Sequence, residues 1–567
     1  MRKYLLLILC LSAISCAIVS KDLTRIQLAI PNDKDNRTQT INRSSTTLTT
    51  PTSNEDSRMP WRQEVIGYTT YDWQYNGPVY SHCRVDPVGN GVHCYWMYSN
   101  FNPATDRNQR YNFYDFVTRT WNWSDGIIVF YGRSGFGGMD YDPITGCAIA
   151  STHQTIGGVL TPVVARDQAP GAGLFEYCSG PSGYQGPAIA VTNNQAIHIV
   201  AMTGDSLLYL RIQPWYNWTP PVGIAGPGSA GYNIAASKTT NKVIIVWQAS
   251  NDIGQKRAFY RLSTDGGVAW GPQTQIPFPP SQGLVPSFHT SSLFAMFDNQ
   301  DNFHIVTSVS DTGHTIPAEI WHYCPINPQP WTLIHHYDAE TLNAGVGYNA
   351  IFATRPSIVQ DPTTSRFYVA WEVFDSLNYE PTTFLARADI WLAELINNGQ
   401  FVSRRQRITN PNTTSKRFPC IGGIQGDTIF IQYMIDSIAG FENMTQGRAT
   451  RNPIVVYRRH RNEYSIEEEL APEKFNSFIL SPASPNPFTS HTTIHYSLPA
   501  KSRVSLSIYD ISGKLIKTLV NGYKRIGDYT VFWDGKDEHK RPVAEGVYFY
   551  TLVTSIQTFT KKIVLMK

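Results

Sequence analysis

Five polar residues stand just beyond short, alternating strands that the sequence predicts between residues 93 and 435. They are His153, Asp205, Asp311, Glu372 and Asp436. If these strands surround one centre, the loops after them rim it, and carboxylates that converge there suit a cation or a sugar. The simpler interpretation, which we favour, is that these residues form turns, because aspartate is common in β-turns. We predict no cofactor and no metal site, and leave a structural cation such as calcium open.

Two further groups of residues invite a chemical interpretation. His335 and His336 are adjacent, so on a strand their rings point to opposite faces and cannot share a metal ion. The aromatic side chains of "PWYNWTPP" (214–221) suit stacking on a sugar, and they equally suit packing inside the fold. We favour packing.

The strands that must position these groups recur along the chain. The copies are "HCYWMYS" (93–99), "CAIASTH" (147–153), "IHIVAMT" (197–203), "VIIVWQA" (243–249), "FHIVTSV" (303–309), "FYVAWEV" (367–373) and "IFIQYMI" (429–435). An interval of roughly fifty residues, with about four strands in each, is typical of a β-propeller. The chain is therefore predicted to be all-β, with a seven-bladed or alternatively six-bladed propeller over 63–462. The segment 64–74 precedes the first copy and would supply the outer strand of the last blade, which closes the ring.

One motif points to a family of propellers. "STDGGVAW" fits Ser-x-Asp-x-Gly-x-x-Trp through Ser263, Asp265, Gly267 and Trp270. The serine and aspartate bond backbone N–H groups across a tight turn, the glycine supplies a positive φ, and the tryptophan wedges the hairpin into the blade. The motif resembles the Asp-box of sialidase-like, BNR-repeat propellers. In those families the box lies away from the active face, so the resemblance concerns the fold and not catalysis.

The sialidase resemblance would also imply three arginines that grip a carboxylate, a Tyr–Glu nucleophile pair and an aspartate acid/base. This chain offers "TRPSIV" at Arg355 and "KRFPC" at Arg417, and neither has the family's form or lies near the first blade. We therefore name no catalytic residue from the sequence.

Composition and the ends of the chain indicate export. Lys plus Arg number 47 and Asp plus Glu 44 in 567 residues, which gives no electrostatic footprint for nucleic acid. Residues 1–20 have the basic start, short apolar run and small residues of a secretory signal peptide, and no later segment is long enough to span a membrane. Cys16 lies in a box similar to that of bacterial lipoproteins, so lipidation and ordinary cleavage both fit. Residues 21–62 are Ser- and Thr-rich and predict a disordered linker.

Six cysteines follow the predicted leader, and none is in a CxxC pair. An oxidising compartment allows disulfides. Cys83 and Cys94 fall on strands that we predict to be neighbours, so they are the favoured pair. Burial of all six as small apolar side chains is the alternative.

The chain ends in a separate β-module over 481–567, after a linker at 463–480. Its alternating segments and Gly/Asp turns suit an immunoglobulin-like sandwich. "SPNPF", "IYDISGKLIKTL", "FWDGKDEHKRPVAEGVYFY" and "KKIVLMK" resemble the type A C-terminal sorting domain of type IX secretion cargo, and equally the related Ig-like domain of the flagellar hook-capping protein. The resemblance implies a diderm bacterium, the type IX secretion machinery as a partner, and a secreted or outer-surface location.

Two classes of function fit this organisation. The first, which we favour from the sequence, is a non-enzymatic propeller that binds a glycan or a surface protein. The alternative is a secreted glycoside hydrolase, sialidase-like, or a lyase on the same scaffold. An enzyme predicts Arg or Glu/Asp side chains packed together at one end of the channel, with a pocket of roughly 300–1,000 Å³. A binding module predicts a plugged channel rimmed by scattered turn residues.

Overall fold

The computed structural model describes residues 61–461 and 479–566, apart from 76, 101–103, 252–253, 284, 340, 481–482, 484, 499–501, 525–526 and 555–557. The predicted signal peptide, Cys16 and nearly all of the two predicted linkers lie outside these residues. No helix in the described part of the chain is long and apolar enough to cross a membrane. The helical element η1 (Glu442–Met444) is a single short turn.

Residues 61–461 form seven antiparallel sheets, which we number as blades 1–7. Blade 1 contains β2 (Cys83–Asp86), β3 (Gly91–Tyr98), β4 (Asn108–Asp115), β5 (Thr120–Trp121) and β6 (Ile127–Ile128). Blade 2 contains β7 (Met139–Tyr141), β8 (Ala148–Ile156), β9 (Val159–Asp167) and β10 (Phe175–Ser179), and blade 3 contains β11 (Gln185–Val191), β12 (Ile197–Thr203), β13 (Ser206–Ile212) and β14 (Val222–Ala225). Blade 4 contains β15 (Ser229–Ala236), β16 (Val243–Ser250), β17 (Lys256–Ser263) and β18 (Thr274–Ile276).

Blade 5 contains β19 (Pro286–Phe288), β20 (Phe294–Phe297), β21 (Phe303–Asp311), β22 (Ala318–Tyr323) and β23 (Trp331–Tyr337). Blade 6 contains β24 (Ala353–Gln360), β25 (Phe367–Glu380), β26 (Leu385–Ile396) and β27 (Phe401–Arg407). Blade 7 contains β28 (Ser415–Gln425), β29 (Thr428–Asp436), β30 (Asn452–His460) and, from the start of the described chain, β1 (Trp61–Thr69).

The innermost strand of each blade faces a central channel; it is the first strand of the blade except in blade 5, where it is β20. Strands β2, β7, β11, β15, β20, β24 and β28 contact one another in this order, and β28 returns to β2, so the circle closes. This arrangement is a β-propeller, as predicted. The recurring sequence pattern marks the second strand of every blade, where apolar side chains such as Trp96, Trp247 and Trp371 are fully buried.

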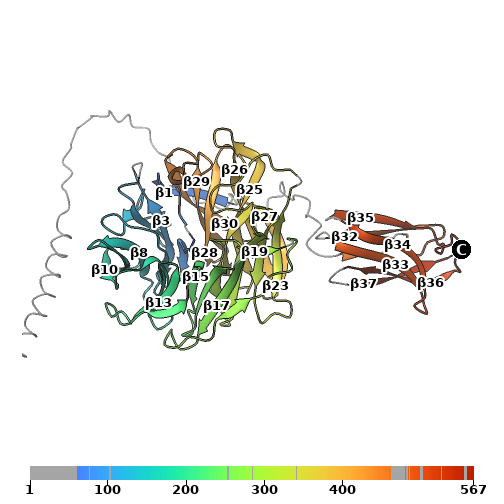
Figure 1. Ribbon diagram of the computed structural model, residues 1–567, viewed down its shortest axis with the longest axis horizontal. Helices are drawn as coiled ribbons and strands as arrows, with labels where there is room; N and C mark the ends of the chain where they lie inside the picture. Colours follow the sequence, from blue (N-terminus) through green and yellow to red (C-terminus); the bar gives the residue numbers. More distant parts are fainter. Residues whose placement is uncertain are drawn as a thin grey trace, which may run out of the picture. The chain divides into compact units, whose positions relative to one another are not determined.

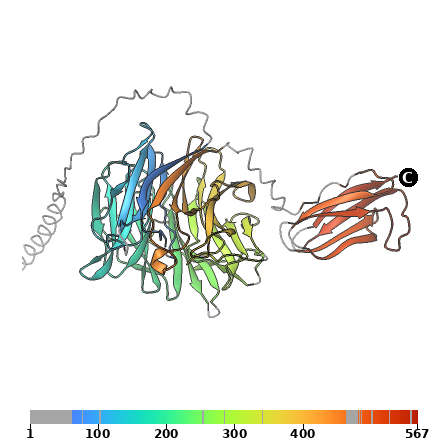
Figure 2. The same cartoon turned by 90° about the horizontal axis from the view of Figure 1, so that it is seen from above.

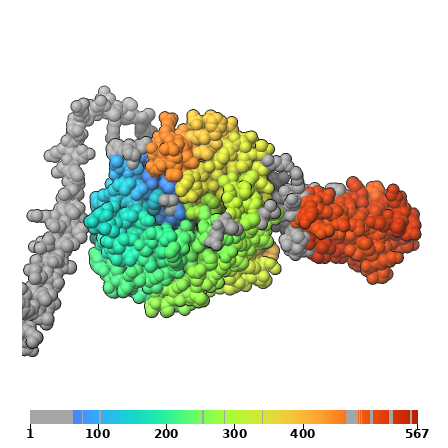
Figure 3. Space-filling model, viewed as in Figure 1, coloured from blue at the N-terminus to red at the C-terminus, as the bar shows by residue number. Residues whose placement is uncertain are grey.

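The ring is closed by the first described strand, as predicted. β1 pairs antiparallel with β30, from Trp61 opposite Arg459 to Thr69 opposite Asn452. It thus becomes the outer strand of blade 7 and joins the two ends of the propeller sequence. Figures 1 and 2 show the blue strand β1 beside the orange strands of blade 7, and the blue and orange surfaces adjoin in Figure 3.

The two faces of the propeller follow from strand direction. We call the face at which the innermost strands begin the upper face, and the face at which they end the lower face. Because neighbouring strands are antiparallel, the ends of the second strands and the starts of the first strands lie together at the upper face. Ser415 opposite Asp436 is one such pair.

Residues 479–566 form a separate sandwich, as predicted for the C-terminal module. One sheet contains β31 (Ile479–Leu480), β32 (Thr492–Leu498) and β35 (Gly527–Trp533). The other contains β34 (Leu515–Lys524), β33 (Ser502–Asp510), β36 (Gly546–Val553) and β37 (Thr558–Leu565). Ile494, Leu506 and Trp533 are among the fully buried side chains of its core.

The Asp-box residues lie between β17 and β18, at the lower face. Ser263 Oγ accepts a hydrogen bond from Gly267 N at 2.8 Å, and Asp265 Oδ1 accepts from Ala269 N at 3.0 Å. Gly267 has a φ of +78°. Trp270 packs edge-on against Tyr209 of blade 3, with ring centroids 4.8 Å apart. The box therefore fixes a turn and joins two blades, far from the upper face.

The arrangement of the cysteines differs from the expected Cys83–Cys94 disulfide. Cys83 and Cys94 are cross-strand partners, as predicted, but their Sγ atoms are 3.9 Å apart and all six described cysteines are free and buried. A disulfide requires about 2 Å between the sulfur atoms. Cys420 lies against the same pair, with its Sγ accepting from His82 N at 3.3 Å. The three thiols fill the core as small apolar groups, so the predicted disulfide is not present.

Candidate functional site on the upper face

A segment from outside the repeats fills the upper part of the channel. Residues 70–82, which we call the crossing segment, link β1 to β2. Gly77 N donates to Ser291 Oγ of blade 5 at 2.9 Å, and Val79 O accepts from Asn233 Nδ2 of blade 4 at 2.7 Å. Tyr75 packs edge-on against Phe418 of blade 7. The segment therefore reaches the far side of the ring and plugs the channel with side chains.

Two arginines meet one glutamate beside the crossing segment. Glu372, near the upper end of β25, accepts hydrogen bonds from Arg355 Nη1 and, at 2.9 Å, from Phe418 N. Arg417 Nε is 3.4 Å from Oε2 of Glu372, the oxygen that accepts from Phe418 N. All three charged side chains are buried, with at most 1% of each exposed. A buried ion cluster of this kind needs good geometry, because desolvation opposes it.

The backbone around the cluster is held in an uncommon conformation. Arg355 has a φ of +53° and Phe418 a φ of +57°, both in the left-handed region that side chains other than glycine rarely adopt. Each is the middle of a bulge where an innermost strand slips against its neighbour. Such strain costs roughly 1–3 kcal/mol per residue and gathers at functional sites.

Two aspartates complete the cluster. Asp436 ends β29, and burial together with the nearby Asp72 charge raises its pKa to about 8. Asp72, in the crossing segment, has its pKa raised to about 6 by burial, although Glu442 N donates to it at 2.7 Å. A carboxyl group with a pKa near 8 keeps its proton at neutral pH, so Asp436 has the properties of a proton donor.

Four polar atoms of this cluster are buried without a hydrogen-bond partner in the described part of the chain. They are Asp72 Oδ1, Asp436 Oδ2, Arg417 Nη2 and Arg355 Nε. Buried polar atoms are nearly always paired, so a group of unpaired ones indicates a place for water or a ligand. No set of three or more His, Cys, Asp or Glu residues among those described is arranged to hold a metal ion.

A pocket of about 880 Å³ lies beside the cluster. One wall is the hairpin of β25 and β26, which projects beyond β24 because β24 ends its pairing at Ala353, opposite Val373. The other wall is the loop between β29 and β30, through Ile438, Gln446 and Arg448. Ile438 N donates to Asp436 Oδ1 at 3.0 Å, so this loop separates the pocket from the buried aspartates.

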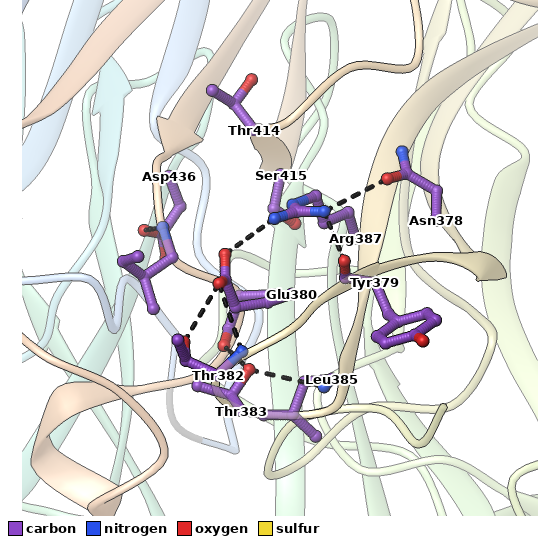
Figure 4. Close-up of polar contacts among 12 residues, drawn as sticks. Asn378, Tyr379, Glu380, Thr382, Thr383, Leu385, Arg387, Thr414, Ser415 and Asp436 are labelled. Atoms are coloured by element: carbon purple, nitrogen blue, oxygen red, sulfur yellow. Dashed lines mark hydrogen bonds and ion pairs between the residues drawn. The ribbon is translucent and has the colours of Figure 1, made fainter. Parts of the chain in front are cut away.

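The polar groups of the pocket are held in fixed positions (Figure 4). Arg387 Nη2 donates to Glu380 Oε2 at 2.7 Å, and Thr382 Oγ1 donates to Glu380 Oε1 at 3.0 Å. Burial alone would raise the pKa of Glu380, but these hydrogen bonds and the Arg387 charge outweigh it and lower the pKa. Glu380 is therefore ionised at neutral pH and suits binding rather than proton donation. Thr383 Oγ1 donates to Ala439 O at 2.9 Å and joins the two walls.

The structure brings together two of the five residues that the sequence singled out. Glu372 and Asp436 both lie beside Arg417. Asp205 accepts from Gly228 N at 3.1 Å and Asp311 from Val285 N at 2.8 Å, so both hold turns, of blades 3 and 5. His153 Nδ1 accepts from Gly186 N at 3.0 Å, and burial with nearby arginine charge lowers its pKa to about 4.

The other sequence interpretations concern side chains away from this site. His335 is buried against Trp371 and Trp391, whereas His336 Nδ1 lies 3.1 Å from Glu319, so the two rings do face opposite ways. Within 214–221, Trp218 Nε1 donates to Cys178 Sγ of blade 2. The contact joins two blades and fits the packing interpretation for Trp218, whereas Tyr216 is 61% exposed.

Asp72, Arg355 and Arg417 are the functional candidates that sequence reasoning missed. Asp72 lies in a segment with no repeat to mark it. Arg355 and Arg417 were set aside because their motifs lack the sialidase form. Their common signal is a proline next to the bulge of an innermost strand, in "TRPS" and "KRFP".

Comparison with known families assigns the C-terminal module. Residues 488–557 match the profile of the FlgD Ig-like domain, which agrees with the sandwich described above. The match covers that module and not the propeller. A comparison with curated protein sequences found no match.

Solved structures similar to the chain are propeller enzymes that act on glycans. An ulvan lyase of family PL25, bound to -[GlcA(1-4)Rha3S]-, is 10% identical with a TM-score of 0.46, and the match covers 70% of this chain and 96% of the lyase. An α-L-arabinanase from Penicillium chrysogenum, with arabinobiose, is 12% identical with a TM-score of 0.35, covering 70% and 97%. A sialidase from Streptococcus pneumoniae is 11% identical with a TM-score of 0.36, covering 71% of each chain. These structures resemble the chain in fold only. The assignment of a propeller rests on the strand topology described above.

Proposed function

We propose that this protein is a glycan-cleaving enzyme whose reacting centre is the cluster of Asp72, Asp436 and Arg417. The observation that carries the proposal is the set of three unpaired, buried polar atoms on these residues, next to a pocket large enough for sugar units. Charged side chains packed at one end of the channel are what an enzyme requires, and scattered turn residues alone would not supply them.

The roles follow from the two raised pKa values. Hydrolysis and β-elimination of a glycosidic bond both need a proton for the leaving oxygen, and Asp436, with a pKa of about 8, can carry that proton at neutral pH. Asp72, with a pKa of about 6, is then the ionised partner carboxylate. Arg417 Nη2 is placed to donate a hydrogen bond to an acidic group of the substrate.

A substrate can reach the two buried aspartates only if the loop that covers them moves. At most 5% of Asp72 and 1% of Asp436 is exposed, and the loop 437–447 donates backbone hydrogen bonds to both. The sugar would first bind in the pocket, between this loop and the β25–β26 hairpin, and reach the aspartates when the loop moves aside. Active-site loops commonly act in this way.

The test is an assay of the purified full-length protein on ulvan, arabinan and sialylated glycans, with detection of new reducing ends and of unsaturated products. We expect cleavage of at least one substrate. Asp436→Asn should lower kcat at least about 100-fold, because general-acid catalysis contributes about 10²–10⁴-fold. Asp205→Asn, a turn aspartate of blade 3, is the matched control and should retain activity. Equal activity of the two variants would refute the assignment.

Non-enzymatic glycan binding is the second candidate, favoured by the Glu380–Arg387 pair. This pair and the Thr382 hydroxyl offer fixed hydrogen-bonding groups without a free acid. In affinity electrophoresis, retention of the protein by a glycan that it does not cleave, and loss of retention in Glu380→Gln, would favour binding. Absence of both cleavage and retention would contradict both candidates.

For the C-terminal module we propose a role in export by type IX secretion. Its support is the resemblance of its sequence landmarks to cargo sorting domains, together with its match to the related FlgD Ig-like domain. Deletion of residues 481–567 in the native bacterium is expected to leave the protein inside the cell envelope. Normal delivery of the truncated protein to the medium or surface would refute this role.

A further inference from the structure

The lower end of the channel holds a second pocket, separate from the site described above. It has a volume of about 410 Å³ and is lined by the ends of the innermost strands of all seven blades. The crossing segment closes it from above, since Val79 belongs to the same buried apolar cluster as Phe294 and Ile358 of its wall. The pocket therefore opens to the lower face, and its size is within the range of small-molecule sites.

The wall of this pocket is largely apolar. The side chains that line it include Ile234, Ala235, Phe294, Met296, Ile358 and Ile424. Small residues such as Ala190 and Ala235 keep the channel axis open, where larger side chains would fill it. An apolar cavity of this size favours the apolar body of a ligand over water.

A group of charges stands at one side of the pocket. Asp140 is 97% buried, and its carboxylate lies 2.7 Å from Lys238 Nζ and 3.4 Å from Arg84 Nε. Lys238 also donates to Tyr141 O and Val191 O, so its three hydrogens are used. The pocket lining also contains Asp298, whose carboxylate accepts from Asn302 N at 2.8 Å and lies 3.2 Å from His304 Nε2, so it has its own partners away from Arg84.

Arg84 is the member of the group whose side chain has N–H donors without a hydrogen-bond acceptor among the described residues. In the described part of the chain, its contacts are the Nε ion pair with Asp140 and its position over the Phe294 ring, 5.9 Å from the centroid. The two terminal nitrogens of its guanidinium make no hydrogen bond with these residues, and 22% of the side chain is exposed. A planar guanidinium with free terminal donors matches a carboxylate, which it binds through two parallel hydrogen bonds.

We propose that this lower pocket binds a small organic anion with an apolar body, such as an aromatic or branched aliphatic carboxylate. The carboxylate would pair with the terminal nitrogens of Arg84, and the apolar body would lie against Phe294 and Ile358. The site does not depend on the upper face, because the crossing segment separates the two.

The experiment is a calorimetric titration of the full-length protein with naphthoate and with naphthamide, its neutral counterpart. Naphthoate should bind, and naphthamide should bind at least about tenfold more weakly, because it lacks the charge-assisted pair. Arg84→Met keeps the apolar stem of the side chain and removes the guanidinium group. It should therefore lower the affinity for naphthoate at least about tenfold and leave the affinity for naphthamide nearly unchanged.

Two further variants keep the proposal falsifiable. Ala235→Leu fills part of the pocket without altering Arg84 and should lower the affinity for both ligands. This variant tests the pocket even if Arg84→Met does not fold. Glu380→Gln, in the upper pocket, should change neither affinity. The proposal would be overturned if naphthoate did not bind to the unaltered protein. It would also be overturned if Ala235→Leu bound naphthoate as tightly as the unaltered protein, or if Glu380→Gln lost naphthoate binding.

Discussion

Replacement of Glu372 by glutamine tests whether the buried charges at the head of the channel act as one unit. In the protein, the Glu372 carboxylate accepts from Arg355, from Arg417 Nε at 3.4 Å and from Phe418 N at 2.9 Å. Glutamine keeps the shape but removes the negative charge. Its amide nitrogen would also place a donor against a guanidinium donor. Two arginines would then stay buried without a counter-ion.

The expected cost can be worked from this geometry. At 3.4 Å and an effective dielectric constant of about 20, one guanidinium–carboxylate contact is worth about 5 kcal/mol. Measured losses on breaking buried pairs are about 3–5 kcal/mol, because the remaining charge stays desolvated. We expect Glu372→Gln to lower the free energy of unfolding of the propeller by this amount, a large share of the 5–15 kcal/mol typical of proteins.

Urea unfolding of the full-length protein, followed by near-ultraviolet circular dichroism, measures this loss. Asp427→Asn is the control. It breaks an ion pair between Asp427 and Arg461 in the neighbouring blade 7, where the Asp427 side chain is 48% exposed. Exposed pairs contribute at most about 1 kcal/mol, so the control should change little. A loss below about 1 kcal/mol in Glu372→Gln would refute the description of the cluster as a desolvated unit.

Three other outcomes follow from the structure. The stability contributed by Asp436 is present below the unfolded pKa of about 4 and is lost as pH rises through its folded pKa of about 8, so thermal unfolding should move to lower temperature between pH 5 and 8. Asp436→Asn should flatten this dependence, and an unchanged slope would contradict it. Gly267→Ala should lower the free energy of unfolding more than Gly266→Ala does. Both glycines have a φ near +75°, but only a Cβ atom at position 267 would meet Tyr209 Oη, at 1.8 Å. Equal losses of unfolding free energy in chemical denaturation would count against that contact. Deletion of residues 61–69 should remove the ring closure and yield an expanded, protease-sensitive propeller in limited proteolysis, and a resistant product would show that β1 is dispensable.

The propeller could be predicted from the sequence because its information is local and repeated. Alternating apolar residues in segments such as 243–249 and 429–435 specify a strand buried on both faces, and every copy became the second strand of a blade. The closing strand could be predicted as well, since a first segment with strand character has no partner except in the last blade. The Asp-box turn likewise follows from neighbouring residues alone.

The proposed reacting centre could not be predicted in the same way, because its members are brought together by tertiary structure. Asp72 and Asp436 are separated by most of the chain, and only the course of the crossing segment places one beside the other. Arg355 and Arg417 lie in segments that read as ordinary innermost strands. Their left-handed φ values arise from bulges, which depend on the neighbouring strand and not on local sequence.

The crossing segment is also what gives the buried charges their chemical character. In an open channel, water would solvate Asp436, and the pKa of its carboxyl group would stay near that of a free side chain. Tyr75, fully buried between His82 and Phe418, excludes that water instead. The same segment that blocks the channel therefore raises the pKa of Asp436, and it separates the lower pocket from the buried charges. A plugged channel and a buried pair of aspartates are thus two consequences of one feature, although from the sequence we expect the first in a binding module and the second in an enzyme.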